Sequence, residues 1–563
     1  MMPTFAIHSR TAMERLNRNA PALLLGAAFA VATAVTLVLA SKMTFNADSW
    51  ALLIDRRDPS VDSLLQPHNE HLILIPTLVQ QLILRVFGMT SELPEYIVLI
   101  IFLLATAGLL YVYVKRRVGP WLALFAAVLV LFLGPAWEVL LWPFEITFIG
   151  PILFGLAMLL ALEREDRIGD VAACAFLTAS LCFSSLGIPF IAAAAVAILQ
   201  GGRETWLRRA YIVAIPALLF FLWYLGWGHD AESHMSLRNV LASPRFVAES
   251  VAVAAGALVG LGTDPVSGSV DPVWGRAILV ALVVVLGYRQ WRKPGFSPGL
   301  WPVAAAAAAN WFLTAFNAFP GREPGASRYQ YAGAIFILLI LANLLKGIRV
   351  TRPALWVAAA VTVLALGPNL VVLNQGSDAM RQQAVFTRSD TAAIEIARRT
   401  IDPGFQLNPE LAGTPSLVNI YAGPYLEAVD EYGSPAYSTS ELRSAPEEGR
   451  RQADIILSQA LPLSTDTHLG QFEAGSAAEN CVAVRGGGAG PAEVTVSPGL
   501  TRIELAPGPR AAFSLRRFAV GEYPVPTEGA PGGSTTLLRI PHDAAKLPWH
   551  LHVEAQQPAR VCR

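Results

Sequence analysis

Long apolar runs alternate with short polar loops over the first two thirds of the chain, and no run of that length follows. A membrane-spanning helix needs about 20 mainly apolar residues, and fewer where its ends are embedded in protein. The runs that fit are 21–41, 94–114, 119–135, 146–162, 171–186, 188–200, 210–227, 273–288, 299–316, 330–346 and 353–373. This pattern predicts a helical membrane body at residues 1–374 with about eleven transmembrane helices.

The remaining residues, 375–563, are polar enough to form a domain outside the bilayer. Residues 390–399 and 447–460 have helical periodicity. Thr501–Leu505 and Trp549–Val553 instead alternate apolar and polar side chains with the period of two that strands require. We therefore predict a mixed helical part at 375–475 and a β-sandwich at 476–563, in an α+β domain.

The basic residues of the short loops predict the orientation of the spans, because Lys and Arg are retained in the cytoplasm. With a cytoplasmic N-terminus, the clusters that stay inside are Lys115–Arg117, Arg203–Arg209, Arg289–Lys293 and Lys346–Arg352. The apolar segment 246–262 would invert every later loop if it crossed. We therefore expect it to be re-entrant or interfacial on the outer side, and the tail to lie outside a bacterial plasma membrane.

Composition supports this organisation. The chain is 54% hydrophobic and only 15% charged, with 42 basic and 42 acidic residues. The basic clusters are short and explained by topology, so no nucleic-acid partner is expected. Cys481 and Cys562 flank the end of the tail, and in an oxidising compartment we expect a disulfide, with two free thiols as the alternative.

Three predicted outer loops carry ionisable residues beside the spans. Such groups near a membrane suggest a functional site. The first loop, 42–93, also contains an amphipathic segment, 72–87, that suits an interfacial helix. The loops contain Asp48, Asp55, Arg56, Arg57, His68, Glu70 and His71 in the first, Glu138 and Glu145 in the second, and Arg322, Glu323, Arg328 and Tyr329 in the third.

The order of these features resembles a known superfold. A basic N-terminus, one span, an acid just outside, and then PHNEHLILIPTLVQQLILRVFG before the second span are similar to the GT-C membrane glycosyltransferases that use polyprenyl-phosphate sugars. These include the protein mannosyltransferases and aminoarabinose transferases. Asp48-Ser49 stands where that family has an Asp-Glu pair, and His68–His71 replaces its Pro-Pro. The motifs PHNEH and SRYxY also resemble a group of alanine-rich bacterial membrane proteins.

The resemblance implies transfer of a sugar, with inversion, from a polyprenyl-phosphate donor to an extracytoplasmic glycan, lipid or protein. Asp48 would be the general base, and Arg328 would bind the donor phosphate, with Arg56 or Arg57 as a second cation. The expected pocket residues are Asp55, His68, Glu70, His71, Glu138, Glu145 and Tyr329.

Each role has a structural alternative. Asp48 is also a favoured N-cap for a helix starting at Ser49. Arg328 and Tyr329 suit an interfacial anchor, and Glu138 and Glu145 suit the headgroup layer. His68, Glu70 and His71 are possible ligands of a divalent cation, although the spacing is not that of a zinc helix and hydrogen bonding in the pocket is the preferred interpretation. No cofactor is otherwise expected.

Two other functions remain open at this point. A lipid-glycan flippase would be expected to carry charges within its spans, and these spans contain few. A non-catalytic scaffold for envelope assembly would tolerate Asp48→Asn. In the tail, His550, His552 and Glu554 share one face of a predicted strand, which is either a ligand cluster or, as we prefer, a solvated face.

Overall fold

The computed structural model describes the chain except residues 1–3, 263–270, 293–294, 408–419, 470–480 and 485–491. It divides into two compact units. The first, here the helical body, comprises Met1–Ser41, Asp58–Leu82 and Leu93–Ala379. The second, here the C-terminal unit, comprises Lys42–Arg57, Ile83–Glu92 and Met380–Arg563.

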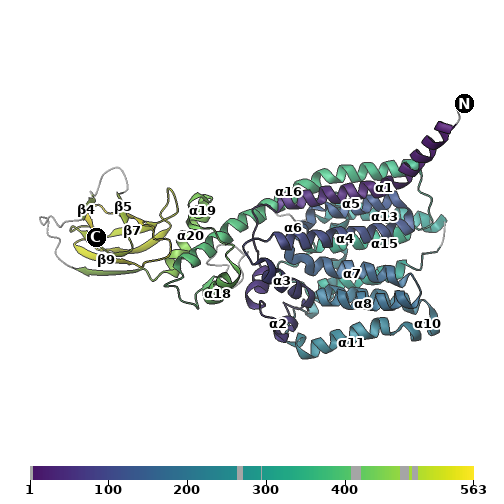
Figure 1. Cartoon of the computed structure of the whole chain (residues 1–563), viewed down its shortest axis with the longest axis horizontal. Helices are drawn as coiled ribbons and strands as arrows, with labels where there is room; N and C mark the ends of the chain where they lie inside the picture. The colour runs from purple at the N-terminus through teal and green to yellow at the C-terminus, as the bar shows by residue number, and fades with distance from the viewer. Residues whose placement is uncertain (1–3, 263–270, 293–294, 408–419, 470–480, 485–491) are drawn as a thin grey trace. The chain divides into compact units, whose positions relative to one another are not determined.

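Every predicted apolar run contains a helix (Figure 1). These helices are α1 (Thr4–Leu39), α4 (Leu93–Val118), α5 (Pro120–Leu131), α7 (Ile146–Leu162), α8 (Arg167–Phe183), α9 (Ile188–Leu199), α11 (Tyr211–Gly226), α13 (Pro272–Arg292), α14 (Leu300–Phe316), α15 (Ser327–Leu344) and α16 (Arg352–Ala397). Shorter or additional helices are α2 (Val61–Leu65), α3 (Leu74–Phe87), α6 (Trp137–Leu141), α10 (Gly202–Arg209) and α12 (Leu237–Leu258).

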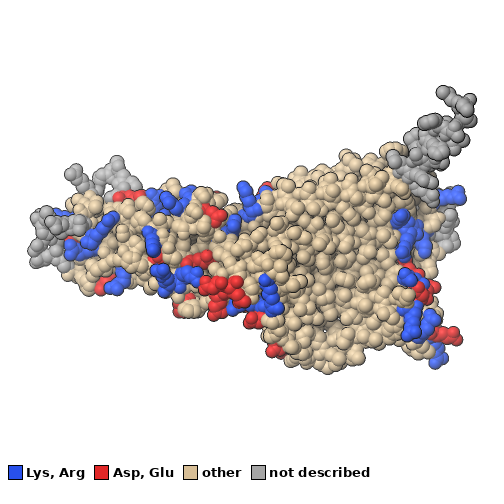
Figure 2. Space-filling view, viewed as in Figure 1, with Lys and Arg blue, Asp and Glu red and all other residues tan. Residues whose placement is uncertain are grey.

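The helices have the length and composition of a polytopic membrane protein. Among the described residues, six are long and apolar enough to cross a membrane, or up to eight if each bent pair counts as one span. Further apolar helices, among them α9, α13 and α14, are shorter. On the face of the body shown in Figure 2, uncharged side chains form a broad band, and the charged side chains lie at its borders. The exposed apolar residues of the body include Leu222 and Val284.

Local signals set several helix ends. The Asp166 side chain accepts the Gly169 amide and caps α8. α5 begins with Pro120 directly after Gly119, whose φ of 96° is accessible to glycine without strain. Near the α7–α8 connection, the buried Arg209 and Asp170 form an ion pair at 2.7 Å. This pair ties the end of α10 to the start of α8.

Both ends of α12 contact the same end of the α14–α15 pair. Asn239, in its first turn, donates hydrogen bonds to the carbonyls of Phe316 and Ala318, where α14 ends. Near the other end of α12, the Ala254 side chain lies against Gly333, in the second turn of α15. A helix of 22 residues is about 33 Å long at 1.5 Å per residue. Its length alone would therefore allow it to cross a bilayer. However, residues near both of its ends contact the same end of the α14–α15 pair.

The C-terminal unit includes a segment from the beginning of the chain. Trp50 is 1% exposed and packs edge-to-face against Tyr425, at 5.9 Å between ring centroids. Arg57 forms an ion pair of 2.7 Å with Glu427. The Met89 amide donates to the Tyr432 carbonyl. Tyr425, Glu427 and Tyr432 all belong to α18 (Ala422–Tyr432), so residues from before the second span pack on a helix more than 300 residues later.

The first part of the C-terminal unit is mainly helical. The last turns of α16 are followed by the short pair β1 (Gln406–Leu407) and β2 (Ile420–Tyr421), and then by α18, α19 (Thr439–Ser444) and α20 (Glu447–Ala460). A capping box of Ser438 and Glu441 begins α19. The carboxylate of Asp454 on α20 accepts the amides of Arg517, Phe518 and Ala519, which connects α20 to the strands.

Two antiparallel sheets complete the unit. One has four strands in the order β5 (Ala492–Val496), β10 (Trp549–Glu554), β7 (Ala511–Arg516) and β8 (Val525–Ala530). The other has five in the order β3 (Ser464–Leu469), β9 (Ser534–Ile540), β6 (Gly499–Leu505), β11 (Ala559–Cys562) and β4 (Cys481–Val484). The predicted disulfide Cys481–Cys562 is present and joins directly paired residues of β4 and β11.

Candidate functional site

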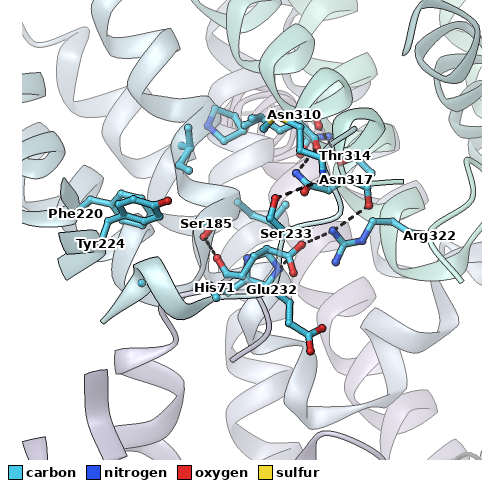
Figure 3. Close-up of a pocket in the computed structure, with 18 of the residues that line it drawn as sticks. His71, Ser185, Phe220, Tyr224, Glu232, Ser233, Asn310, Thr314, Asn317 and Arg322 are labelled. Carbon is cyan, nitrogen blue, oxygen red and sulfur yellow. Dashed lines mark hydrogen bonds and ion pairs between the residues drawn. The ribbon is translucent and has the colours of Figure 1, made fainter. Parts of the chain in front are cut away.

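The helical body contains a cavity of about 320 Å³ (Figure 3). One wall is apolar and aromatic, and Phe220 and Tyr224 of α11 lie on it. The opposite wall is polar and is formed by the end of α14 and the loop to α15. The polar or charged residues that line the cavity are Glu70, His71, Ser185, Glu232, Ser233, Asn310, Thr314, Asn317, Arg322 and Tyr329. The cavity is therefore amphipathic and suits a ligand that has both an apolar chain and a polar group.

An ion pair stands in the polar wall. Arg322 Nη1 contacts Glu70 Oε1, and the two residues are 252 positions apart in the sequence. The Arg322 side chain is 12% exposed, and its guanidinium also lies 4.7 Å from the Phe319 ring. A partly buried guanidinium in a cavity wall is suited to bind an anion, because its charge is poorly screened and it offers several donors.

The backbone around Glu70 is fixed on two sides. His68 and His71 exchange amide-to-carbonyl hydrogen bonds of 2.9 Å, which close a tight turn around Asn69 and Glu70. The Ser185 hydroxyl donates to the Glu70 carbonyl at 2.9 Å. Burial raises the pKa of the Glu70 carboxyl, but His71 and Arg322 together more than offset this, so the pKa lies below its ordinary value. Glu70 is therefore an ionised carboxylate at neutral pH.

The second predicted arginine, Arg328, has a different environment. The Glu138 carboxylate accepts the Arg328 amide at 3.1 Å, and Arg328 Nε lies 3.4 Å from the same oxygen. The Ser327 hydroxyl in turn accepts the Glu138 amide. This reciprocal arrangement caps the N-terminus of α15, where a negative charge is favourable. Neither Glu138 nor Arg328 is among the residues that line the cavity.

Tyr329 interacts with charged residues of both ion pairs. It lines the cavity, and Arg322, Arg328, Glu70 and Glu145 all act electrostatically on its phenol. Glu145 is 1% exposed, at the end of the 3₁₀ turn Pro143–Glu145 that precedes α7. Thus Glu70, His71, Glu138, Glu145, Arg328 and Tyr329, which the sequence placed in three separate loops, belong to the helical body and cluster around the start of α15.

The other predicted residues belong to the C-terminal unit. Half-buried Asp48 lies in a turn after Ala47, whose φ is 41°, and directly before the buried Ser49 and Trp50. Asp55 ends the π-helical turn Ala51–Asp55. Burial lowers the pKa of the neighbouring Arg56, against the opposing effect of Asp55. Arg57 pairs with Glu427, so a structural role is available for it.

Metal and ligand candidates were also present in the sequence. Within the part of the chain that the structure describes, no group of three or more His, Cys, Asp or Glu side chains is arranged to hold a metal ion. The His68 ring instead lies 5.3 Å from the Phe144 ring.

In the tail, His550 and His552 lie on the face of β10 opposite the buried Trp549 and Leu551. His550 Nδ1 lies 2.7 Å from a Glu493 oxygen, and the His552 ring stacks on Tyr523.

No family model matches the sequence, and no curated protein does. Among solved structures, the chain is similar to ArnT from Cupriavidus metallidurans bound to undecaprenyl phosphate, with 13% identity and a TM-score of 0.45 over 80% of this chain and 93% of ArnT. It is also similar to the arabinosyltransferase EmbB from Mycobacterium smegmatis, with 11% identity and a TM-score of 0.38 over 95% of this chain and 64% of EmbB. The chain thus spans less than two thirds of EmbB. The roles of individual residues have to be argued from the geometry of this chain itself.

Several cavity residues were not predicted. Arg322 was placed in the third outer loop without a role, and Ser185, Asn310, Thr314 and Asn317 were not singled out. One signal was available: Asn310 interrupts the apolar run of α14, and a buried amide within a membrane helix often marks a functional site. Thr314 lies one turn further along the same helix, and Asn317 directly follows its last residue and continues the polar stripe.

Proposed function

We propose that this chain is an integral-membrane glycosyltransferase that moves a sugar from a polyprenyl-phosphate donor to an extracytoplasmic glycan, lipid or protein. The observation that carries the proposal is the amphipathic cavity in the helical body. Its aromatic wall, with Phe220, Trp223 and Tyr224, suits a polyprenyl chain, and Arg322 in its polar wall suits the phosphate. The resemblance of residues 45–100 to the GT-C transferases supports the same reaction.

In this mechanism the acceptor hydroxyl attacks the anomeric carbon of the donor sugar. The bond from that carbon to the phosphate oxygen breaks, and the electron pair leaves with polyprenyl phosphate. The resemblance assigns the base to Asp48, which would take the hydroxyl proton as the new bond forms. Arg322 stabilises the charge that develops on the leaving phosphate, with Arg328 as the second candidate cation. Arg56 and Arg57 remain weaker candidates for that role.

We also infer that the chain crosses a bacterial plasma membrane eleven times, with its N-terminus in the cytoplasm. Residues 42–57 follow the first predicted span, and they fold into one unit with residues 380–563. Both must therefore lie on the same side of the membrane, so the number of crossings between them is even. Ten predicted spans satisfy this requirement. Counting α12 as an eleventh would break it, and the contacts at the two ends of α12 support the same conclusion.

The inward side chains of the two sheets, such as Phe513 and Leu551 from one and Ile503 and Leu538 from the other, belong to one hydrophobic core. We infer that the sheets pack face to face as a β-sandwich on the outer side of the membrane. The disulfide is consistent with an oxidising compartment.

The test is transfer by the purified full-length protein in lipid nanodiscs, with a panel of radiolabelled polyprenyl-phosphate sugars and envelope extracts as acceptors. We expect at least one donor to be consumed with release of polyprenyl phosphate. Asp48→Asn should slow this about 100-fold or more, as expected for loss of a general base. The exposed Asp58→Asn, in the same loop, is the matched control and should leave the rate unchanged.

The outcomes separate the hypotheses. Full activity of Asp48→Asn would remove Asp48 as the base without removing the transferase. Movement of intact lipid-linked sugar across vesicles, without cleavage of any donor, would favour a flippase. Neither transport nor turnover with any donor would favour a scaffold.

A further inference from the structure

The arginine best placed to bind a lipid phosphate already forms an ion pair with a carboxylate. Arg322 and Glu70 form an ion pair in the cavity wall. Their side chains are 12% and 21% exposed, respectively. A phosphate that enters the cavity cannot bind the free charge of Arg322, because Glu70 neutralises it. It must instead compete with Glu70 for the guanidinium.

Both partners are held in place by their own loops. The Arg322 amide donates to the Phe319 carbonyl, and its guanidinium lies near the Phe319 ring and 3.5 Å from the Asn317 carbonyl. Glu70 is held by the His68–His71 turn and by Ser185. Two side chains on fixed backbones can therefore separate and meet again by rotation about their own bonds.

A displaced Glu70 would have a second partner. His71 Nε2 lies 3.7 Å from the Glu70 oxygen that contacts Arg322. A protonated imidazole at that distance would stabilise the carboxylate after the guanidinium has turned to a phosphate. The exchange would then not leave a buried carboxylate without a counter-charge, which would be costly.

The competition acts differently on substrate and product. The donor is a phosphodiester with one negative charge, whereas polyprenyl phosphate is a monoester that carries nearly two at neutral pH. The product would therefore bind an unopposed arginine more tightly than the donor does. We propose that Glu70 is a displaceable counter-ion of Arg322, which yields to the lipid phosphate during transfer and returns to release the polyprenyl-phosphate product. This inference rests on the proposed function, and it makes Glu70 a positioning residue rather than a catalytic one.

The experiment titrates full-length protein in nanodiscs with undecaprenyl phosphate and reads occupancy by native mass spectrometry. Glu70→Gln should bind the lipid about tenfold more tightly than the wild type, because the competing charge is gone while the shape is kept. Arg322→Gln should weaken binding at least tenfold. In the double variant the gain from Glu70→Gln should disappear, since it acts only through Arg322.

Turnover kinetics distinguish a counter-ion role of Glu70 from a merely structural one. In Glu70→Gln steady-state turnover should slow relative to the first turnover, with product inhibition about tenfold stronger than in the wild type. Glu204→Gln, on the exposed surface of α10, is the control and should change neither quantity. If Glu70→Gln proves unstable, Glu70→Asp should give a smaller shift in the same direction, because the shorter side chain reaches Arg322 less well.

The possible failures are distinguishable. If the wild type binds undecaprenyl phosphate and Glu70→Gln binds it equally or more weakly, the counter-ion role is wrong and the proposed function stands. An equal gain in the Arg322→Gln background would also overturn it. If the wild type binds no polyprenyl phosphate and turns over no donor, the proposed function is wrong and the inference falls with it.

Discussion

At the scale of single residues, Arg322 and Arg328 show that one residue type has different structural roles in different surroundings. They are six positions apart, and both meet a glutamate from a distant loop. Glu138 also accepts the Arg328 backbone amide, so this pair caps a helix. Glu70 contacts Arg322 in the wall of a cavity, where a ligand can reach both. The difference is the surroundings, since the functional groups are the same.

The lowered pKa of Glu70 gives a prediction for pH. Because the folded-state pKa lies below the ordinary value near 4.3, the ion pair stabilises the fold fully above that value. Its contribution is lost only as the pH falls through the lower, folded-state pKa. The difference in Tm between wild type and Glu70→Gln should therefore be constant from pH 7 to about pH 5 and should shrink below pH 4. A difference that already disappears between pH 7 and 5 would contradict the assignment.

At the scale of elements, α12 combines the composition of a candidate span with contacts at one end of the α14–α15 pair. Its 22 residues qualify as a span by composition. Yet Asn239 near its start and Ala254 near its end both contact the end of the α14–α15 pair at which the two helices are joined. Buried side chains of α12, such as Val253 and Ala255, are apolar because they face protein.

Cysteine labelling tests this arrangement. In a background with Cys174→Ser and Cys182→Ser, we introduce Leu237→Cys and Leu261→Cys, which replace exposed residues at the first position of α12 and shortly after its end. A membrane-impermeant maleimide added to intact cells should label both. Phe296→Cys, in the loop between α13 and α14, should be labelled only after the cells are opened.

Labelling of Leu237→Cys and Leu261→Cys from opposite sides would show that α12 crosses. It would also contradict the even count of crossings between residues 57 and 380.

At the scale of the whole molecule, the C-terminal unit is assembled from both ends of the chain. Trp50 lies between Phe45 and Tyr425, and its side chain is almost fully buried. The segment that carries Asp48 is thus part of the core of the C-terminal unit. This explains why the acidic candidate of the first loop is not an isolated surface residue.

Trp50→Ala should therefore destabilise the C-terminal unit by about 3–5 kcal/mol, as expected for removing a buried tryptophan. The measurement is the Tm of the purified full chain, with limited proteolysis of residues 380–563 as a second readout. Trp356→Ala removes a side chain that is 76% exposed on α16, and it should change neither. Equal effects of the two substitutions would show that the first loop does not contribute to the core.

The sequence by itself determined the features that depend on local pattern. Each apolar run predicted a helix that the body contains, the period of two predicted β6 and β10, and the position of Cys481 and Cys562 in the tail, together with the expected compartment, predicted the disulfide. The first and third outer loops supplied Glu70, His71 and Tyr329 of the cavity. These predictions succeed because burial in lipid or in a sheet imposes a repeat that neighbouring residues show directly.

Only the tertiary structure decided which distant groups meet. The partner of Arg322 is 252 residues away, and that of Arg57 is 370 residues away. Two further features depend on packing rather than on composition. One is whether α12 crosses the membrane, and the other is the position of Trp50 in the C-terminal core. The physical reason is that an ion pair or a ring contact depends on the distance between two groups in space. The separation of the two residues along the chain does not determine that distance.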